Sequence, residues 1–492
     1  MSKNKLKART PRGFEDRLGA DIAAEDALVQ RAAGVFERWG FSRLETPAFE
    51  FTDALGKFLP DKDRPGEGVF SLTDDDDQWM SLRYDLTAPL ARYVAQNSQS
   101  VGRPFRRWQA GPVWRNEKPG PGRFRQFTQC DADSVGVPGP AADAEIIMVA
   151  CDALEAIGVP RGAYGVRINT RKALNAVLDV VTTAGSASVD DQAGKILRAI
   201  DKLDRLGLEG VTALLGEGRL DESGDYTEGA KLDSASVDRV MAFVQAGRAD
   251  GASTVAALED VIGAGEAGRS ALDELKAMTA LLDAAGYDGE RAMIDPSIVR
   301  GLDYYTGPVF EAQLELTTPA GDPIGVGSVG GGGRYDDLVA RFTGQSMPAT
   351  GFSIGVSRLI TALNAAERPL LPATTGPVLV LAFEDSDMPD YFDLAARIRT
   401  LGAPAEVYLG GAGMRAQMKY ADRRGSPLVV MYGADEKAAG IVNLKDLREG
   451  AEQAKSITDN ETWREERPGQ FEVPIADLEA AVERVLNRGD RA

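Results

Sequence analysis

The sequence predicts a protein of two or three domains: an α+β domain interrupted by a helical segment, followed by a small α/β domain. Its 492 residues exceed a single ordinary core. Two β-compatible runs flank a turn cluster at residues 119–122, which indicates an antiparallel hairpin in the first domain. Between about residues 186 and 287 aromatic residues almost vanish and helical periodicity prevails. Beyond residue 377 short apolar strands alternate with helical stretches, which is typical of an α/β domain with a mostly parallel sheet.

Composition restricts the class of protein and its chemistry. A hydrophobic content of 43% and a charged content of 27% are typical of soluble globular proteins. Two cysteines fit a reducing cytoplasm, the basic start lacks the apolar core of a signal peptide, and no apolar run reaches membrane-spanning length. We therefore expect a cytoplasmic protein with no membrane association. The chain has no histidine, so histidine acid–base chemistry and histidine metal ligation are excluded, and no cysteine cluster offers a zinc site.

The first elements are expected to be a helix, a strand and a strand-to-helix junction. Apolar residues at helical spacing predict an amphipathic helix over residues 22–39, which Gly40 ends. A strand follows over residues 41–46 and Pro47 closes it. The four aspartates at residues 74–77 indicate a solvated loop. Residues 79–89, WMSLRYDLTAP, read as a strand passing into a helix, for which Asp85 or Thr87 can act as N-cap.

The predicted hairpin is strongly basic in an acidic chain. The formal net charge is −19, yet residues 103–125 contain seven basic residues and one acid, Glu117, a local excess of +6. Such a patch predicts an anionic ligand, although a solvated charged hairpin is the plain alternative. The basic residues are Arg103, Arg106, Arg107, Arg115, Lys118, Arg123 and Arg125.

Side chains of the second hairpin strand alternate between two faces. One face carries, in order, two arginines, an aromatic ring, an amide and two carboxylates: Arg123, Arg125, Phe127, Gln129, Asp131 and Asp133. From Arg125 to Asp133 this face extends about 26 Å. We expect it to hold a long ligand, with phosphate near the arginines and a cationic or hydrogen-bond-donating group near the aspartates.

The remaining elements end in the C-terminal domain. We expect a helix over 141–157, a strand over 164–169, and a strand passing into a helix over 351–359. The glycine run 330–333 lets backbone approach a ligand closely. Arg358 would lie in the first turn of a helix. A cation there is unfavourable, because the helix N-terminus carries partial positive charge, unless a phosphate binds beside it. C-terminal strands are expected at 377–383, 405–409 and 428–432, and helices at 387–401, 414–424 and 475–486.

Several motifs together resemble one enzyme family. Arg115-x-Glu117 followed by Arg123, Phe127 and Asp131 resembles motif 2 of the class II aminoacyl-tRNA synthetases. The first helix, strand and Pro47 resemble motif 1, and residues 351–359 resemble motif 3. Residues 82–87, LRYDLT, and residues 300–307, RGLDYYTG, resemble segments of the histidyl-tRNA synthetases. The chain thus resembles the histidyl-tRNA synthetase family.

This resemblance implies an architecture. The catalytic domain would be an α+β domain with an antiparallel sheet, built from residues 1–185 and 286–368. A helical insertion would occupy residues 186–285 and a linker residues 369–376. The α/β domain at residues 377–492 would bind the anticodon, and Pro47 would lie at the interface of a homodimer.

The resemblance also implies an activity, histidine–tRNA ligation. Histidine would be activated with ATP, in the presence of Mg²⁺, to histidyl-adenylate and transferred to the 3′ end of tRNA(His). Arg300 and Arg115 would be catalytic. Histidine would be bound by Asp85, Thr87, Arg115, Gln129, Asp133, Arg300, Tyr304 and Tyr305. ATP would be bound by Arg115, Glu117, Arg123, Phe127 and Arg358. A basic helix face would contact tRNA through Arg415, Lys419 and Arg423, with a solvated helix face as the alternative. No metal ligands are expected in the protein.

Other functions are less consistent with the sequence. A synthetase-like regulatory subunit of ATP phosphoribosyltransferase would usually lack the anticodon domain and lose active-site residues, whereas this chain keeps Arg115, Arg300 and Arg358. A prolyl or threonyl enzyme is disfavoured by the RGLDYYTG segment. Asn116 and Thr128 stand where the family often has histidine, so the acceptor-end nucleotides required on the tRNA stay open. Without histidine, we expect a pre-ionised pocket that exchanges few protons between pH 6 and 8.

Overall fold

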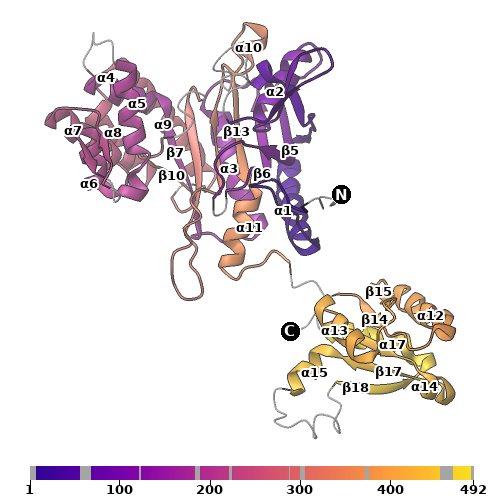
Figure 1. Cartoon of the computed structure of the whole chain (residues 1–492). Coiled ribbons are helices and arrows are strands. Elements are labelled where there is room, and N and C mark those ends of the chain that lie inside the picture. Colours follow the sequence, from indigo (N-terminus) through magenta and orange to yellow (C-terminus); the bar gives the residue numbers. More distant parts are fainter. Residues whose placement is uncertain are drawn as a thin grey trace, which may run out of the picture. The chain divides into compact units, whose positions relative to one another are not determined.

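The computed structural model describes residues 7–55, 68–120, 123–182, 189–220, 224–287, 289–299, 305–371, 376–454 and 469–488. The chain divides into two compact units, Met1–Leu371 and Pro372–Ala492, and each is described by itself (Figure 1).

An eight-stranded sheet forms the centre of the first unit. Its inner strands run antiparallel, and only the two edge strands, β1 and β10, pair in parallel with their neighbours. The predicted antiparallel sheet is therefore confirmed, and the hairpin at its heart is β5 and β6. In spatial order the strands are β1 (Ser42–Arg43), β5 (Phe105–Trp114), β6 (Gln126–Val135), β13 (Ala349–Gly355), β12 (Gly330–Arg334), β11 (Pro308–Leu314), β7 (Tyr164–Thr170) and β10 (Ala292–Ile294).

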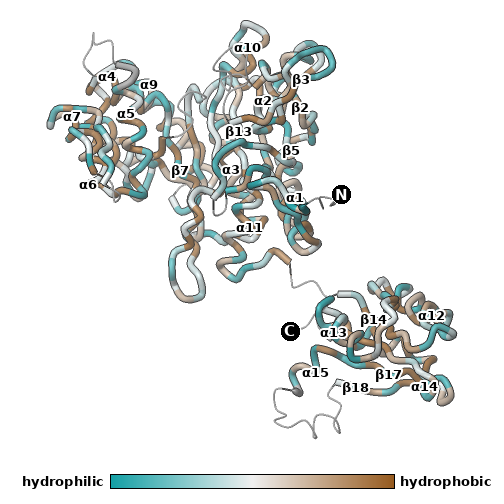
Figure 2. Tube along the Cα trace, in the orientation of Figure 1, coloured by the Kyte–Doolittle hydropathy of each residue, from teal (hydrophilic) through white to brown (hydrophobic). Residues whose placement is uncertain are grey.

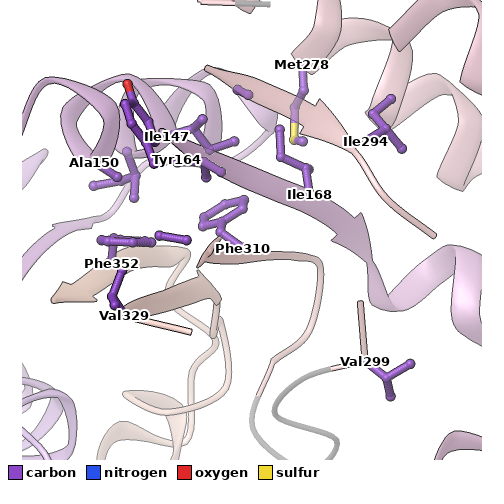
Figure 3. Packing of buried hydrophobic residues seen from close by; sticks show 14 of the residues in the cluster. Ile147, Ala150, Tyr164, Ile168, Met278, Ile294, Val299, Phe310, Val329 and Phe352 are labelled. Carbon is purple, nitrogen blue, oxygen red and sulfur yellow. The ribbon is translucent and has the colours of Figure 1, made fainter. Parts of the chain in front are cut away.

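Three helices cover one face of this sheet: α1 (Gly19–Arg38), α3 (Pro140–Ile157) and α11 (Val356–Ala365). Alternation along the strands explains the burial, because every second side chain points to the helices. Cys130 of β6 and Phe352 of β13 lie in this core. Figure 3 shows Phe352 and its neighbour Phe310 beside Ile147 of α3. The intervening residues of β6 and β13 face the opposite side of the sheet, where a cavity is found.

A small three-stranded sheet lies near the turn end of the hairpin, where the backbone N–H of Trp114 donates to the Arg83 carbonyl, and a helix packs near the start of the hairpin, against Phe105 and Val135. The sheet has the order β2 (Phe49–Phe51), β4 (Trp79–Leu82), β3 (Ser71–Thr73), with all pairings antiparallel. The short 3₁₀ helix Thr52–Leu55 follows β2. Helix α2 (Thr87–Gln96) begins directly after the Arg83–Leu86 segment and contacts the small helix α10 (Ala340–Thr343).

Helices gather beside the β7–β10 edge of the main sheet (Figure 1). Helix α9 contacts both α3 and α4, so the helical region shares its core with the sheet. A two-stranded hairpin, β8 (Gly218–Leu220) with β9 (Tyr226–Glu228), lies among these helices. The helices are α4 (Arg171–Val181), α5 (Val189–Ile200), α6 (Leu203–Leu215), α7 (Ser234–Val244), α8 (Gly251–Ile262) and α9 (Glu266–Ala284).

The second unit is built on a five-stranded mixed sheet. Strand β14 pairs in parallel with β15 and β16, whereas β16–β17 and β17–β18 are antiparallel. The prediction of a mostly parallel sheet was therefore wrong for half of the pairings. The spatial order is β15 (Ala405–Val407), β14 (Val378–Val380), β16 (Leu428–Met431), β17 (Ile441–Asp446) and β18 (Gln470–Pro474).

Helices cover both faces of this second sheet. Helices α12 (Met388–Arg399) and α17 (Leu478–Arg488) pack on one core, and α13 (Met414–Arg424) and α15 (Leu447–Ala454) contact the other. Shorter helical turns are Asp385–Asp387, α14 (Ala434–Ala439) and Ile475–Asp477. In Figure 2, α13 is largely hydrophilic whereas β14 is hydrophobic. Among the helices of the described residues, none is long and apolar enough to cross a membrane.

Candidate active site

A cavity of about 400 Å³ lies on the face of the main sheet opposite helices α1, α3 and α11. Its walls come from the segment before α2, from the hairpin β5–β6, from the glycine strand β12 and from the end of β13 with the start of α11. These segments lie far apart in the sequence, so the fold assembles the cavity. Its polar and aromatic lining residues include Tyr84, Asp85, Thr87, Arg115, Glu117, Arg123, Phe127, Gln129, Asp131, Asp133, Tyr305, Tyr335, Ser353 and Arg358.

One end of the cavity combines cationic and aromatic side chains. The Arg115 guanidinium lies 4.3 Å from the centre of the Tyr84 ring and 5.1 Å from that of Phe127, at cation–π distance from both. The Tyr84 hydroxyl donates a 2.6 Å hydrogen bond to Glu117. Burial, opposed by Arg115 and assisted by this hydrogen bond, raises the pKa of Tyr84 to about 12, so the hydroxyl stays protonated at neutral pH. A flat aromatic surface thus adjoins a cation.

Two further arginines reach this end. Arg358 lies in the first turn of α11, as predicted, and its guanidinium donates a 2.7 Å hydrogen bond to the carbonyl of Ser328. Arg123 lines the cavity beside Phe124. Because the start of α11 presents unpaired backbone N–H groups and a partial positive charge, an anion is the natural ligand for this end.

The opposite end is acidic. Asp85 accepts hydrogen bonds from the backbone N–H groups of Thr87 and Ala88, at 3.2 and 2.9 Å, and so stabilises the start of α2. Both Asp85 and Thr87 also line the cavity. The N-cap alternative and the ligand-binding prediction for Asp85 are therefore geometrically compatible.

Asp133 is held by two partners at this acidic end. Its Oδ2 lies 2.9 Å from a guanidinium nitrogen of Arg107, and its Oδ1 accepts a short hydrogen bond from the Tyr335 hydroxyl. The same Arg107 nitrogen donates to the Leu86 carbonyl at 2.9 Å, between Asp85 and Thr87. Arg107, which is 0% exposed, thus connects Asp133 with the segment that carries Asp85 and Thr87.

Glycines make room for these contacts. An ideal Cβ at Gly351 would lie 2.5 Å from Asp133 Cγ, and one at Gly332 would lie 2.8 Å from the Cα of Phe352. A side chain at either position would displace backbone or the buried carboxyl group. The glycine run therefore serves close strand packing as well as access to the cavity.

The end of β12 is fixed by a buried ion pair. Arg334 donates to Asp143 at 2.8 and 3.0 Å, which connects the glycine strand to the first turn of α3. Burial, opposed by Arg334, raises the pKa of Asp143 to about 6. Because Arg334 precedes Tyr335, this pair also positions the hydroxyl that contacts Asp133.

Gln129 and Asp131 present buried acceptors to the cavity. Gln129 donates a 2.6 Å hydrogen bond to Ser353. Within the described part of the chain, Gln129 Oε1 and both carboxylate oxygens of Asp131 have no hydrogen-bond partner. Burial, opposed by Arg107 and reinforced by Asp133, raises the pKa of Asp131 to about 8, and burial also raises the pKa of Asp133. These directions run against the expected pre-ionised pocket, because a low-dielectric site disfavours two adjacent carboxylates without an added cation.

The structure separates the basic residues that sequence counting had grouped. Arg115 and Arg123 line the cavity, but Arg107 is buried against Asp133, and Arg106 pairs with Glu145 at 2.9 Å. Arg125 donates to the Glu117 carbonyl instead of lining the cavity. Fewer positive charges therefore face the cavity than the local excess of +6 in the sequence suggests.

The other predicted site residues have different positions. Arg300 and Tyr304 lie outside the described residues, whereas Tyr305 lines the cavity. Pro47 is exposed just before β2. The sequence assigned no role to Tyr84, Tyr335 or Ser353, all of which line the cavity. It placed Asp131 on the ligand-binding face without a specific role, and it counted Arg107 in the basic patch, whereas Arg107 supports Asp133.

The predicted tRNA-contacting residues lie on α13. Arg415, Lys419 and Arg423 are exposed at successive turns. Gln417 on the opposite side is buried and exchanges hydrogen bonds with the backbone of Ala382, which fixes the helix against the sheet.

Metal binding by protein side chains finds no support in the described residues. No group of three or more carboxylates or cysteines there has the arrangement of a metal site.

Comparisons with known proteins identify the family. The histidyl-tRNA synthetase family model matches residues 13–359, and an anticodon-binding domain model matches residues 377–467. The histidine–tRNA ligase of Caulobacter vibrioides is 56% identical over 482 residues, covering 97% of each chain, and that of Brucella ovis is 53% identical over 488 residues, covering 98% of this chain and 97% of its own. The crystal structure of histidyl-tRNA synthetase from Nostoc sp. PCC 7120 superposes with a TM-score of 0.70 at 28% identity, covering 98% of this chain and 100% of that one. The chain belongs to the histidyl-tRNA synthetase family.

Proposed function

We propose that this protein is a histidine–tRNA ligase, which activates histidine with ATP and transfers it to the 3′ end of tRNA(His). The observation that carries this proposal is that the two ends of the cavity differ in charge. Arginines and aromatic rings form one end, and buried carboxylates form the other. A nucleotide and a cationic amino acid can therefore lie in line, with their reacting groups meeting in the middle. The curated ligases at 53–56% identity favour this activity over a regulatory-subunit role.

ATP would occupy the arginine end. We assign the adenine to the face of Phe127 and to Glu117, which Tyr84 holds by its 2.6 Å hydrogen bond. Arg115 and Arg123 would contact the phosphates nearest the reacting centre. Arg358 would contact the terminal phosphate at the start of α11, where a bound anion reverses the unfavourable interaction of a cation with the helix N-terminus.

Histidine would occupy the acidic end. We assign its ammonium to Asp85, Thr87 and Gln129, and its imidazole to Asp133 and Tyr305, with Tyr304 as a further contact. A site built to hydrogen-bond a ring nitrogen rejects apolar analogues, because its own polar groups would be left unpaired.

The activation step needs no protein base. The carboxylate of histidine is already a nucleophile: it attacks the α-phosphorus, one P–O bond forms, the bond to the bridging oxygen breaks, and pyrophosphate leaves. The protein's contribution is positioning and stabilisation of the developing phosphate charge, by Arg115 and, as the family resemblance implies, by Arg300. This chemistry is consistent with a chain that contains no histidine.

Magnesium would enter with the nucleotide. At the arginine end, Glu117 is the carboxylate that lines the cavity, and its partner is Tyr84. That arrangement suits a Mg²⁺ ion held mainly by phosphate oxygens and water, as is usual for this ion. When bound, it would offset phosphate charge.

Domain roles follow from the same proposal. Residues 1–185 and 286–368 would form the catalytic domain, residues 186–285 a helical insertion and residues 369–376 a linker. Residues 377–492 would bind the anticodon arm, with α13 presenting Arg415, Lys419 and Arg423 to phosphates. A cytoplasmic location fits a protein that acts on tRNA.

A homodimer is part of the proposal. The strands β2, β3 and β4 expose Phe49, Phe51 and Leu72 on one face, next to Pro47. Met80 on the central strand β4 pairs with Phe51 of β2 on one side and with Leu72 of β3 on the other. The three apolar side chains are therefore neighbours across the sheet. An exposed cluster of this kind is characteristic of an interface between subunits.

Isotope exchange between pyrophosphate and ATP tests the function. The assay supplies each of the twenty amino acids in turn, without tRNA. The proposal predicts exchange with histidine and with no other amino acid, followed by charging of tRNA(His) when the tRNA is added. Absence of histidine-dependent exchange would refute ligase activity and favour a regulatory role.

A further inference from the structure

Asp131 is a buried carboxylate on the strand face that was expected to hold the ligand, but it is not among the residues assigned above to histidine or ATP. It is 1% exposed and lines the cavity between Gln129 and Asp133, which share its face of β6. Ser353, the hydroxyl acceptor of Gln129's hydrogen bond, lies directly opposite Asp131 on β13. Asp131 is therefore next to the groups assigned to the substrate's ammonium.

Asp131 does not serve as the counter-ion of the buried arginine. The ion pair of Arg107 is made with Asp133, at 2.9 Å. Within the described part of the chain, Asp131 makes no ion pair within 4.0 Å and neither of its oxygens accepts a hydrogen bond of good geometry, and the hydroxyl of its polar neighbour Ser353 lowers its pKa only in part. A buried carboxylate without partners is costly, so an unsatisfied one that lines a cavity indicates a ligand.

The unpaired atoms define the chemistry of that ligand. Three acceptors, Gln129 Oε1 and the two carboxylate oxygens of Asp131, lie on adjacent positions of one strand face. A primary ammonium carries three N–H donors and a full positive charge. Asp133 is less available, because Arg107 and Tyr335 already contact its two oxygens.

We propose that Asp131 is a further substrate-binding residue, which together with Gln129 binds the α-ammonium of histidine, and that binding displaces a proton from the Asp131–Asp133 pair. This inference rests on the proposed function and deepens it by adding a residue and a proton to substrate binding.

Charge balance supports the displaced proton. Several charged or titratable groups surround Asp131 from the elements packed against it: Arg83 and Asp85 before α2, Arg107 on β5, Cys130 and Asp133 on β6, Tyr305 before β11 and Tyr335 after β12. Burial holds the pKa of Asp131 at about 8 in the free protein. A bound ammonium favours the ionised carboxylate, so the proton leaves below pH 8 and affinity for histidine rises with pH up to about 8.

Calorimetric titration of the full-length protein with L-histidine, without ATP, tests the proposal. Two buffers of different ionisation enthalpy report the protons released on binding; after subtraction of the substrate's own titration, we expect most of one proton per site at pH 7.0 and a smaller release at pH 8.5. No release at pH 7.0 in the wild-type protein would overturn the proposal, whatever the behaviour of any variant.

The variant Asp131→Asn removes the charge and keeps the shape. We expect its dissociation constant for histidine to rise about 10- to 100-fold, its proton release to vanish, and kcat in pyrophosphate exchange to stay within about threefold. Asp152→Asn is the matched control, because it removes a partly buried carboxylate that pairs with Arg291 and does not line the cavity. We expect it to keep wild-type affinity and proton release.

Other outcomes separate this inference from the proposed function. If Asp131→Asn bound histidine within threefold of wild type, or bound weakly but released the same proton, Asp131 would be structural and the proposal would fail. Histidine-dependent exchange by the wild-type protein would still stand in that case. Absence of that exchange would instead overturn the function itself.

Discussion

Gly351→Ala should disrupt the acidic end of the cavity. The added Cβ would lie 2.5 Å from Asp133 Cγ and 3.0 Å from the Ala132 carbonyl. Because the Cβ would lie closer still to Asp133 Oδ1 and ordinary contacts begin near 3.4 Å, the carboxyl group must move by more than about 1 Å or the strands must separate. Either change lengthens the 2.9 Å contact with Arg107 and the hydrogen bond from Tyr335. Overpacking costs about 1–3 kcal/mol and loss of a buried ion pair about 3–5 kcal/mol.

We therefore expect Gly351→Ala to lower the free energy of unfolding by about 3–5 kcal/mol and to raise the KM for histidine about 100-fold. Urea denaturation and pyrophosphate exchange measure the two effects. Gly102→Ala is the control, because a Cβ there meets open space. Stability within 1 kcal/mol of wild type and an unchanged KM for Gly351→Ala would refute this reasoning.

Three further perturbations address the nucleotide, the tRNA and the dimer. Tyr84→Phe keeps the ring beside Arg115 but loses the hydrogen bond to Glu117, so the KM for ATP should rise about 10-fold with the KM for histidine unchanged; an equal rise in both constants would contradict the assignment. Binding of tRNA(His) should weaken steeply as the salt concentration rises, and Lys419→Ala should reduce the slope of log K against log [salt] by about one unit in filter-binding assays. A slope equal to that of the wild-type protein would mean that this face of α13 is solvated and does not contact tRNA. Phe51→Glu should shift the mass found by sedimentation from dimer to monomer, and an unchanged dimer would exclude this face as the interface.

Strand alternation predicted the lining of the cavity well. Counting along one strand grouped six residues, Arg123, Arg125, Phe127, Gln129, Asp131 and Asp133, and all of them except Arg125 line the cavity. Alternation succeeds because it is a local property of extended backbone and survives any arrangement of neighbouring strands.

Charge counting was less successful, because it ignores partners distant in sequence. Arg107 was included in an anion-binding patch, yet it pairs with Asp133 across the hairpin. Hairpin register could have revealed this pairing, because a turn centred near residue 120 brings residue 107 opposite residue 133. Tyr335, which donates a hydrogen bond to Asp133, lies 202 residues further along the sequence. No local sequence pattern predicts a contact over that separation.

The C-terminal sheet was mispredicted for a physical reason. Alternating strands and helices suggested parallel pairing, but the connection between β16 and β17 runs only from residue 432 to residue 440. A parallel crossover needs a dozen or more residues. A connection as short as this one therefore favours antiparallel pairing, which is what the structure shows.

The central claim is that one cavity holds nucleotide at its arginine end and amino acid at its acidic end. A crystal structure of the protein with histidinol, which cannot be activated, and ATP tests it most directly. We expect the adenine against Phe127, the phosphates near Arg115 and Arg358, and the amine of histidinol beside Gln129 and Asp131. Phosphates at the acidic end, or histidinol bound outside the cavity, would contradict the account.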